Sequence, residues 1–139
     1  SAIMGKIHSQ DIFIAVAAVA DWRVANASPQ KLKKSNAGHT PQLQFVPNPD
    51  ILAEVAMLEN APFCVGFAAE SENLLEYGAE KRRKKNIPLL VGNIGHATFG
   101  KDENELVLFD AQGYKTLARA SKTLLAQQLI AEISERLPT

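Results

Sequence analysis

Three apolar segments without a charged or amide side chain mark the interior of this 139-residue chain: residues 12–20, 63–69 and 87–91. Each is too short to cross a bilayer, which takes about 20 residues. None alternates polar and apolar positions as a half-exposed strand does. The pattern predicts strands buried on both faces of a parallel sheet, although periodicity alone leaves a buried helix open for residues 12–20.

Segments with helical periodicity lie between these apolar segments and after them. Apolar residues in segment 51–59 recur at helical spacing, and segment 71–85 begins with a serine and an early glutamate that favour a helix start. Segment 124–137 is amphipathic, and Ser121 is a candidate cap for it. We also expect a short helical piece at residues 2–10.

The remaining patterned segments complete an α/β arrangement. Residues 42–47 alternate polar and apolar positions and predict a short strand, after which Asn48 suits an N-cap and Pro49 the first helical position. Residues 105–110 and 114–117 read as a hairpin around a turn with a glycine. The order predicts a Rossmann-like, mostly parallel sheet flanked by helices, with a late β-hairpin.

Composition narrows the class of protein. The length suits one domain, residues 1–139, and 15 basic residues balance 15 acidic ones, so a general nucleic-acid or membrane-surface role has no support. The single cysteine, Cys64, excludes an internal disulfide and lies within an apolar strand, which favours a core thiol over a nucleophile. Residues 1–10 lack an apolar stretch of signal-peptide length, and we expect a cytoplasmic protein. The three histidines are scattered and give no metal-ligand spacing.

Candidate chemistry follows the first apolar segment. Asp21 comes directly after it, and a loop beginning near Pro29 then holds Lys31, Lys33 and Lys34. Ligands of open α/β sheets bind at the carboxyl ends of the strands, so a carboxylate and a cationic loop there suit a metal-bound nucleotide. On position alone, Asp21 could equally end the strand and cap the next element without binding a ligand. The lysines are likewise consistent with a solvated loop that binds nothing.

The sequence does not support two common nucleotide-binding motifs, the phosphate-binding loop and the GxGxxG dinucleotide motif. Residues 95–102, GHATFGKD, approach the phosphate-binding loop pattern, but Asp102 stands where the pattern has a hydroxyl. An extended segment rather than a helix follows it. No glycine-rich GxGxxG segment follows a predicted strand, which argues against a dinucleotide-dependent oxidoreductase.

Six motifs taken in order carry a family resemblance: AAVADW (17–22), KLKK (31–34), NPDI (48–51), VGFAAE (65–70), KRRKKN (81–86) and FGKDEN (99–104). The series resembles phosphopantothenate–cysteine ligase, the synthetase half of the bacterial bifunctional coenzyme A biosynthesis proteins, over nearly the whole chain. The resemblance implies ligation of 4′-phosphopantothenate and L-cysteine through an acyl-cytidylate, with CTP as co-substrate and Mg²⁺ as cofactor. CTP is expected over ATP because the likeness is closer to bacterial members.

The resemblance also implies a set of nucleotide-binding residues. They are Ala15, Val16, Ala17, Asp21, Lys31, Asn48, Pro49, Asp50, Ile51, Leu52, Phe67, Lys81 and Lys85. Lys31 is the expected catalytic lysine, on a loop that closes over the reacting phosphate, and Asp21 is the expected Mg²⁺ ligand. From pattern alone, Phe67 is equally a core residue, and Lys81 and Lys85 equally complement the dipole of a helix end.

Family members carry further parts that this sequence does not match. Their domain begins with a glycine-rich segment and an asparagine for phosphopantothenate, and residues 1–10 do not resemble it. We therefore expect the C-terminal, nucleotide-binding portion of the synthetase domain, with a non-catalytic nucleotide-binding fragment or regulatory subunit as the alternative. The resemblance also implies a homodimer, for which hairpin 105–117 is our candidate element, with an ordinary edge hairpin as the alternative. It implies fusion to, or association with, a decarboxylase domain that holds FMN.

Overall fold

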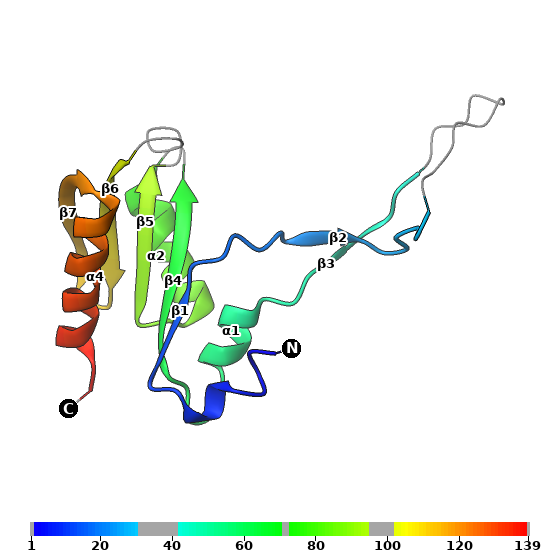
Figure 1. Cartoon of the computed structure of the whole chain (residues 1–139), viewed down its shortest axis with the longest axis horizontal. Helices are drawn as coiled ribbons and strands as arrows, with labels where there is room; N and C mark the ends of the chain where they lie inside the picture. Colours follow the sequence, from blue (N-terminus) through cyan, green and yellow to red (C-terminus); the bar gives the residue numbers. More distant parts are fainter. Residues whose placement is uncertain (1, 31–41, 71–72, 95–101, 139) are drawn as a thin grey trace. The chain divides into compact units, whose positions relative to one another are not determined.

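The computed structural model describes residues 2–30, 42–70, 73–94 and 102–138, which appear as coloured ribbon in Figure 1. The chain divides into two compact units. The first unit comprises Ser1–Val16 and Ile51–Thr139, and the second comprises Ala17–Asp50.

A five-stranded sheet in the order β1-β4-β5-β6-β7 forms the first unit. The strands are β1 (Ile12–Ala15), β4 (Phe63–Glu70), β5 (Leu89–Ile94), β6 (Glu103–Asp110) and β7 (Gly113–Ser121). β1, β4 and β5 run parallel, whereas β6 pairs antiparallel with β5 and β7 antiparallel with β6. The expected Rossmann-like α/β fold with a late hairpin is confirmed, and the hairpin extends the same sheet.

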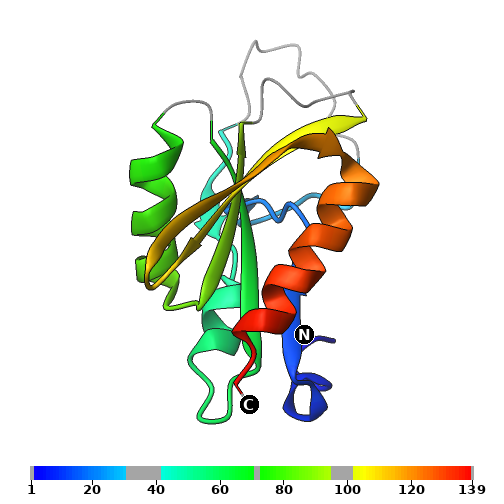
Figure 2. The same cartoon turned by 90° about the vertical axis from the view of Figure 1, so that its left-hand side faces the viewer.

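Helices cover both faces of this sheet, as Figure 2 shows for α2 and α4. α1 (Ile51–Ala56) and α2 (Leu74–Lys85) pack on one face, over a core that includes Val55, Cys64 and Phe109. α4 (Lys122–Arg136) packs on the other face, over a second core that includes Val65 and Leu108. Within the residues that the structure describes, no helix has the length and apolar character that a membrane crossing requires.

The C-terminal helix α4 follows its sequence pattern closely. Its buried apolar residues Leu125, Leu129 and Ile133 recur every four positions and therefore line one face. The hydroxyl of Ser121 accepts a hydrogen bond from the backbone N–H of Leu124 at 3.2 Å, which satisfies one amide of the first turn. Both the amphipathic helix and its serine cap are confirmed.

Helix α2 lies close to the sheet because Gly78 has no side chain. A Cβ placed there would overlap the ring of Phe109, which is buried in β6. Gly92 of β5 also lets α2 approach the sheet, since a Cβ at position 92 would lie only 2.7 Å from Leu74 Cδ1 of α2. The packing of α2 therefore depends on small residues at the contact.

A two-stranded antiparallel ribbon forms the second unit, with β2 (Trp22–Val24) and β3 (Phe45–Pro47) as its strands. Trp22 pairs with Pro47, and the backbone N–H of Ala25 donates to the carbonyl of Gln44 at 2.8 Å. The short strand predicted over residues 42–47 is thus present in its second half.

One prediction from the N-terminal region is wrong and another is met in part. The strand predicted over residues 12–20 ends at Ala15 and is not buried on both faces: Ile12 is 36% exposed and Val16 is 64% exposed. β1 lies at an edge of the described sheet, so its side chains have neighbours on one flank only. The short helical piece predicted at residues 2–10 is present in part, as turns that lead into a short 3₁₀ helix, η1 (Ile7–Ser9), whose Ile7 is buried.

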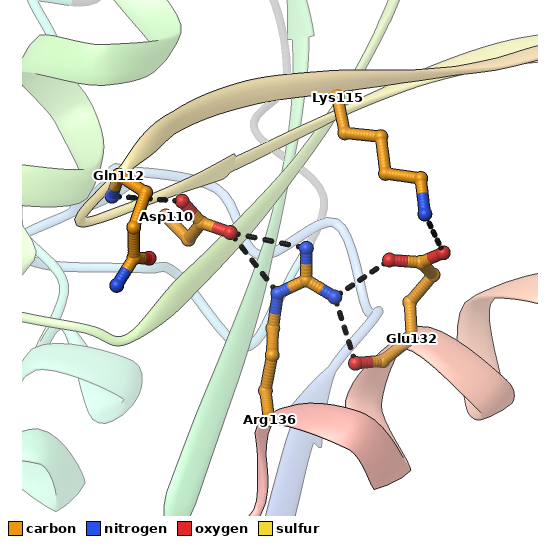
Figure 3. A network of polar contacts seen from close by, with 5 residues as sticks. All are labelled: Asp110, Gln112, Lys115, Glu132 and Arg136. Atoms are coloured by element: carbon orange, nitrogen blue, oxygen red, sulfur yellow. Dashed lines mark hydrogen bonds and ion pairs between the residues drawn. The ribbon is translucent and has the colours of Figure 1, made fainter.

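A network of charged groups joins the hairpin to α4, as Figure 3 shows. The guanidinium of Arg136 binds Asp110 Oδ2 through Nη2 at 3.0 Å and Glu132 Oε2 through Nη1 at 2.7 Å. Lys115 of β7 binds the other carboxylate oxygen of Glu132. Hydrogen bonds from Lys115 and Arg136 lower the pKa of Glu132 below its ordinary value.

The glycine contact gives a first test. Alanine is favoured over glycine in a helix by about 1 kcal/mol. Overlap with the buried Phe109 ring reverses that gain, so Gly78→Ala should lower the free energy of unfolding by about 1–3 kcal/mol. Urea unfolding measures the change. Gly5→Ala is the matched control, because the nearest atom to its Cβ lies 3.9 Å away. Equal stability of the two variants would contradict the close packing.

The charged network predicts a pH dependence. The folded pKa of Glu132 lies below its unfolded value of about 4.3. Its stabilisation is therefore present above that unfolded value and is lost as the pH falls through the folded pKa. Glu132→Gln should lower the free energy of unfolding at pH 7 by about 2 kcal/mol and weaken its dependence on acid.

Glu103→Gln is the control for this test, because Glu103 forms an exposed ion pair with Arg119 at 3.2 Å. Such pairs contribute about 0–1 kcal/mol. Unfolding curves at several pH values compare the two variants. A Glu132→Gln protein with the acid dependence of the parent would show that the network does not act as described.

Candidate functional site

The carboxyl end of β1 is the place of the first group of expected site residues. Ala15, the last residue of β1, pairs with Gly66 in the middle of β4, so Val16 and Phe67 lie next to the point at which β1 ends and β4 continues to Glu70. The side chain of Phe67 is 38% exposed, which places it only partly in the core. Because a Cβ on Gly66 would face Leu52 of α1, the alternating Phe67 projects from the opposite face, on which α4 packs.

Helices α1 and α2 hold a second group on the other face of the sheet. Leu52 is a core residue with 9% exposure, so any role of Leu52 in binding belongs to its backbone. Ile51 packs against the same core. Lys81 and Lys85 stand four residues apart in the unbroken α2 and therefore share a helix face, as expected.

The two neighbouring cations of α2 have structural partners. Arg82 donates from Nη1 to the carbonyl of Ile87, beyond the helix end, at 2.9 Å. Lys84 forms an ion pair with Glu80 at 2.6 Å, and its hydrogen bond and charge lower the pKa of Glu80. These contacts tie Arg82 to the segment after α2 and Lys84 to the helix itself.

The first unit does not bring all of its expected residues together. α2 connects the carboxyl end of β4 to the amino end of β5, so Lys85 lies toward the amino end of β5. Phe67 lies in the middle of β4, next to the end of β1, and projects from the other face. Lys85 and Phe67 therefore belong to separate parts of this unit.

In the second unit, Asn48 forms hydrogen bonds with Asp21 and with its neighbour Ala20. The backbone N–H of Asn48 donates to the carbonyl of Asp21 at 2.7 Å, and the side-chain Nδ2 of Asn48 donates to the carbonyl of Ala20 at 2.7 Å. Arg23 donates from Nη1 to Asn48 Oδ1 at 3.1 Å and to the carbonyl of Pro47 at 2.8 Å. We call this set of contacts among residues 20, 21, 23, 47 and 48 the Asn48 clasp.

The clasp corrects the expected role of Asn48 as an N-cap. Helix α1 begins at Ile51, and the amide of Asn48 bonds to Ala20 instead of to a helix N–H. The ribbon explains this, because the pairing of Trp22 with Pro47 brings Asn48 next to Asp21. Asp21 also does not sit at the end of β1, which stops at Ala15.

The carboxylate of Asp21 is the only part of the clasp suited to a cation. Asp21 is exposed to solvent, as are the expected site residues Ala17, Pro49 and Asp50. Among the described residues, no group of three or more His, Cys, Asp or Glu side chains is placed to hold a metal ion. Mg²⁺ is usually held by one or two carboxylates together with substrate phosphates and water, so a single exposed aspartate fits that mode.

Other expected residues fall outside this geometry. Lys31, Lys33, Lys34 and the segment 95–101 lie outside the described residues. Cys64 is 1% exposed, and burial raises the pKa of its thiol, which confirms a core cysteine.

Arg23 is the residue that sequence reasoning missed. It stands two positions after Asp21 in the ADWR segment, which is a signal only once the ribbon register is known. Its partner Asn48 lies 25 residues away, a pairing that the pattern of the chain does not reveal.

Fold and sequence together assign the chain to a class and a family. The mixed sheet with helices on both faces is a Rossmann-like α/β architecture. Residues 1–137 match the sequence model of the DNA/pantothenate metabolism flavoprotein C-terminal domain, and the chain belongs to that family.

Curated relatives agree with this membership. The chain is 43% identical over 141 aligned residues to the coenzyme A biosynthesis bifunctional protein CoaBC of Escherichia coli, with 98% of the chain and 35% of the relative covered. It is 44% identical over 128 residues to CoaBC of Haemophilus influenzae, with 90% of the chain and 32% of the relative covered. The chain thus spans about a third of the length of these relatives, and the expected family is confirmed.

Solved structures share the fold. The crystal structure of the C-terminal domain of a CoaBC protein superposes with a TM-score of 0.75 at 24% identity, covering 98% of this chain and 59% of that one. A Cab2 mutant in complex with phosphopantothenate-cysteine gives a TM-score of 0.62 at 20% identity, covering 89% of this chain and 44% of that one. At these identities the likeness concerns the fold alone.

Proposed function

We propose that this chain is the nucleotide-binding portion of a phosphopantothenate–cysteine ligase of coenzyme A biosynthesis. The observation that carries the proposal is 43% identity to a CoaBC protein across 98% of the chain. The exposed carboxylate of Asp21 and the paired lysines of α2 supply groups that suit a metal-bound triphosphate.

The proposed reaction has two steps. The carboxylate of 4′-phosphopantothenate attacks the α-phosphate of CTP, which forms an acyl-cytidylate and releases pyrophosphate. The amine of L-cysteine then displaces CMP and forms the amide of 4′-phosphopantothenoylcysteine. Activation is needed because a carboxylate oxygen is a poor leaving group until it carries the nucleotide.

Each group of residues has a proposed task in this scheme. Asn48 to Leu52 present backbone groups to the cytosine and ribose, and Phe67 with residues 15–17 flanks the nucleotide. Lys81 and Lys85 neutralise phosphate charge, and Lys31 stabilises charge that develops on the reacting phosphate. Asp21 would hold Mg²⁺, which when bound supplies further neutralisation of the triphosphate.

A second candidate is nucleotide binding without ligation. It is favoured for the isolated chain by one observation, namely that 35% of the length of the Escherichia coli relative is covered. We also propose a homodimer. We further propose an association with an FMN-binding decarboxylase, and the word bifunctional in the names of the relatives supports this second proposal.

Nucleotide binding gives the first test of this function. A ligand that binds only the folded state at 100 times its Kd raises stability by about 2.7 kcal/mol. Mg-CTP should therefore raise the melting temperature of the chain, and Mg-ATP should raise it less. Asp21→Asn should weaken CTP binding by about tenfold, as calorimetry would measure. The absence of a shift with CTP would contradict the proposal, and unchanged affinity in Asp21→Asn would make that carboxylate structural.

Lys31 gives a test of catalysis separate from folding. In a protein that contains this chain together with the rest of the ligase, Lys31→Gln should abolish ligation, because a positive charge near the reacting phosphate is lost. Product formation and thermal unfolding are measured side by side. Normal ligation by Lys31→Gln, or a loss of activity that comes with a large drop in melting temperature, would count against the catalytic role.

A further inference from the structure

The Asn48 clasp fixes one side-chain amide at both of its polar atoms. Oδ1 accepts from Arg23 at 3.1 Å, and Nδ2 donates to Ala20 at 2.7 Å. Turning the amide over would place Oδ1 against the Ala20 carbonyl and Nδ2 against the guanidinium, so both contacts would become repulsive. Arg23 and the Ala20 carbonyl therefore fix the orientation of the amide together.

The guanidinium also ties the clasp to the ribbon. Through the same Nη1, Arg23 donates to the carbonyl of Pro47, the last residue of β3, at 2.8 Å. Arg23 itself belongs to β2 and pairs with Val46. A two-stranded ribbon is marginally stable in water, so a side chain that bridges both strands at the clasp restricts its fraying.

The clasp fixes the groups around it. The carbonyls of Ala20 and Asp21 and both side-chain polar atoms of Asn48 are occupied by these hydrogen bonds. What remains exposed is the carboxylate of Asp21 and the turn that begins at Pro49. Holding these groups in one geometry before a ligand arrives reduces the ordering cost of binding.

We propose that Arg23 is a positioning residue of the nucleotide site, acting through the amide of Asn48. The inference rests on the proposed function, because Asp21 and Asn48 are its expected nucleotide contacts. Arg23 orients Asn48, and Asn48 holds the Asp21 backbone to the turn at residues 48–50.

The experiment compares Arg23→Met with Arg23→Lys in the full chain. Methionine removes the donor, whereas lysine keeps a cationic donor of similar reach. Calorimetry gives the Kd for Mg-CTP, and NMR of the ligand-free protein gives the exchange rate of the Asn48 side-chain amide protons. Arg119→Met is the matched control, because it removes an exposed arginine from the hairpin ion pair with Glu103, which belongs to the first unit.

The expected result links the two measurements. Arg23→Met should weaken CTP binding by about five- to tenfold, the scale of one net hydrogen bond, and should speed exchange of the Asn48 amide protons. Arg23→Lys should restore most of the CTP affinity and most of the protection of the Asn48 amide protons. Arg119→Met should leave the CTP affinity and the exchange rate unchanged. Unchanged CTP affinity in Arg23→Met would overturn the inference. Weaker binding with unchanged Asn48 exchange would overturn it too, because Arg23 would then act on the nucleotide directly.

A double-mutant cycle covers the case in which Arg23→Met loosens the ribbon. If Arg23 acts through Asn48, the double variant Arg23→Met with Asn48→Ala should bind CTP as weakly as Asn48→Ala alone. Additive losses would contradict that route. A parent chain that binds no CTP would refute the proposed function itself and the inference with it, whereas a binding parent with an unaffected Arg23→Met refutes the inference alone.

Discussion

Parallel pairing of β1, β4 and β5 is the constraint on which the first unit depends. Parallel neighbours cannot be joined by a tight turn, so β4 and β5 require a crossover, and α2 supplies it. The crossover covers one face of the sheet, and it fits there because Gly78 and Gly92 leave room for Phe109 and Leu74. The same pairing sets Ala15 beside Gly66 in the middle of β4, which is why Phe67 lies next to the point at which β1 ends.

The parts of the fold that sequence predicts are those set by local pattern. Buried β4, the hairpin and α4 with its Ser121 cap were all visible as apolar runs, alternation or four-residue spacing. The point at which β1 ends is not visible in the sequence, because hydrophobicity does not distinguish an edge strand from a central one. Gln112 and Gly113 illustrate the local case well: the N–H of Gln112 donates to Asp110 Oδ1 at 2.9 Å, and Gly113 has a φ of 138°, which glycine adopts readily.

The candidate site shows the same division. The i,i+4 relation of Lys81 and Lys85 depends only on a continuous helix and is present. The sequence neighbours of Asn48 predict a helix start, yet its side chain binds Ala20 and Arg23, more than 20 residues away. That outcome is set by the register of the ribbon, which no local signal encodes. The family resemblance adds residues such as Phe67, which the pattern alone places in the core, and the structure shows Phe67 partly exposed in β4, beside the end of β1.

The central claim is that the protein containing this chain activates a carboxylate with CTP. The most direct measurement follows ¹⁸O from the labelled carboxylate of 4′-phosphopantothenate during ligation to L-cysteine, with mass spectrometry of the CMP released. An acyl-cytidylate leaves one carboxylate oxygen on the phosphate of CMP, so the account predicts CMP that carries a single ¹⁸O. Product formed with unlabelled CMP, or no product with CTP at all, would contradict it.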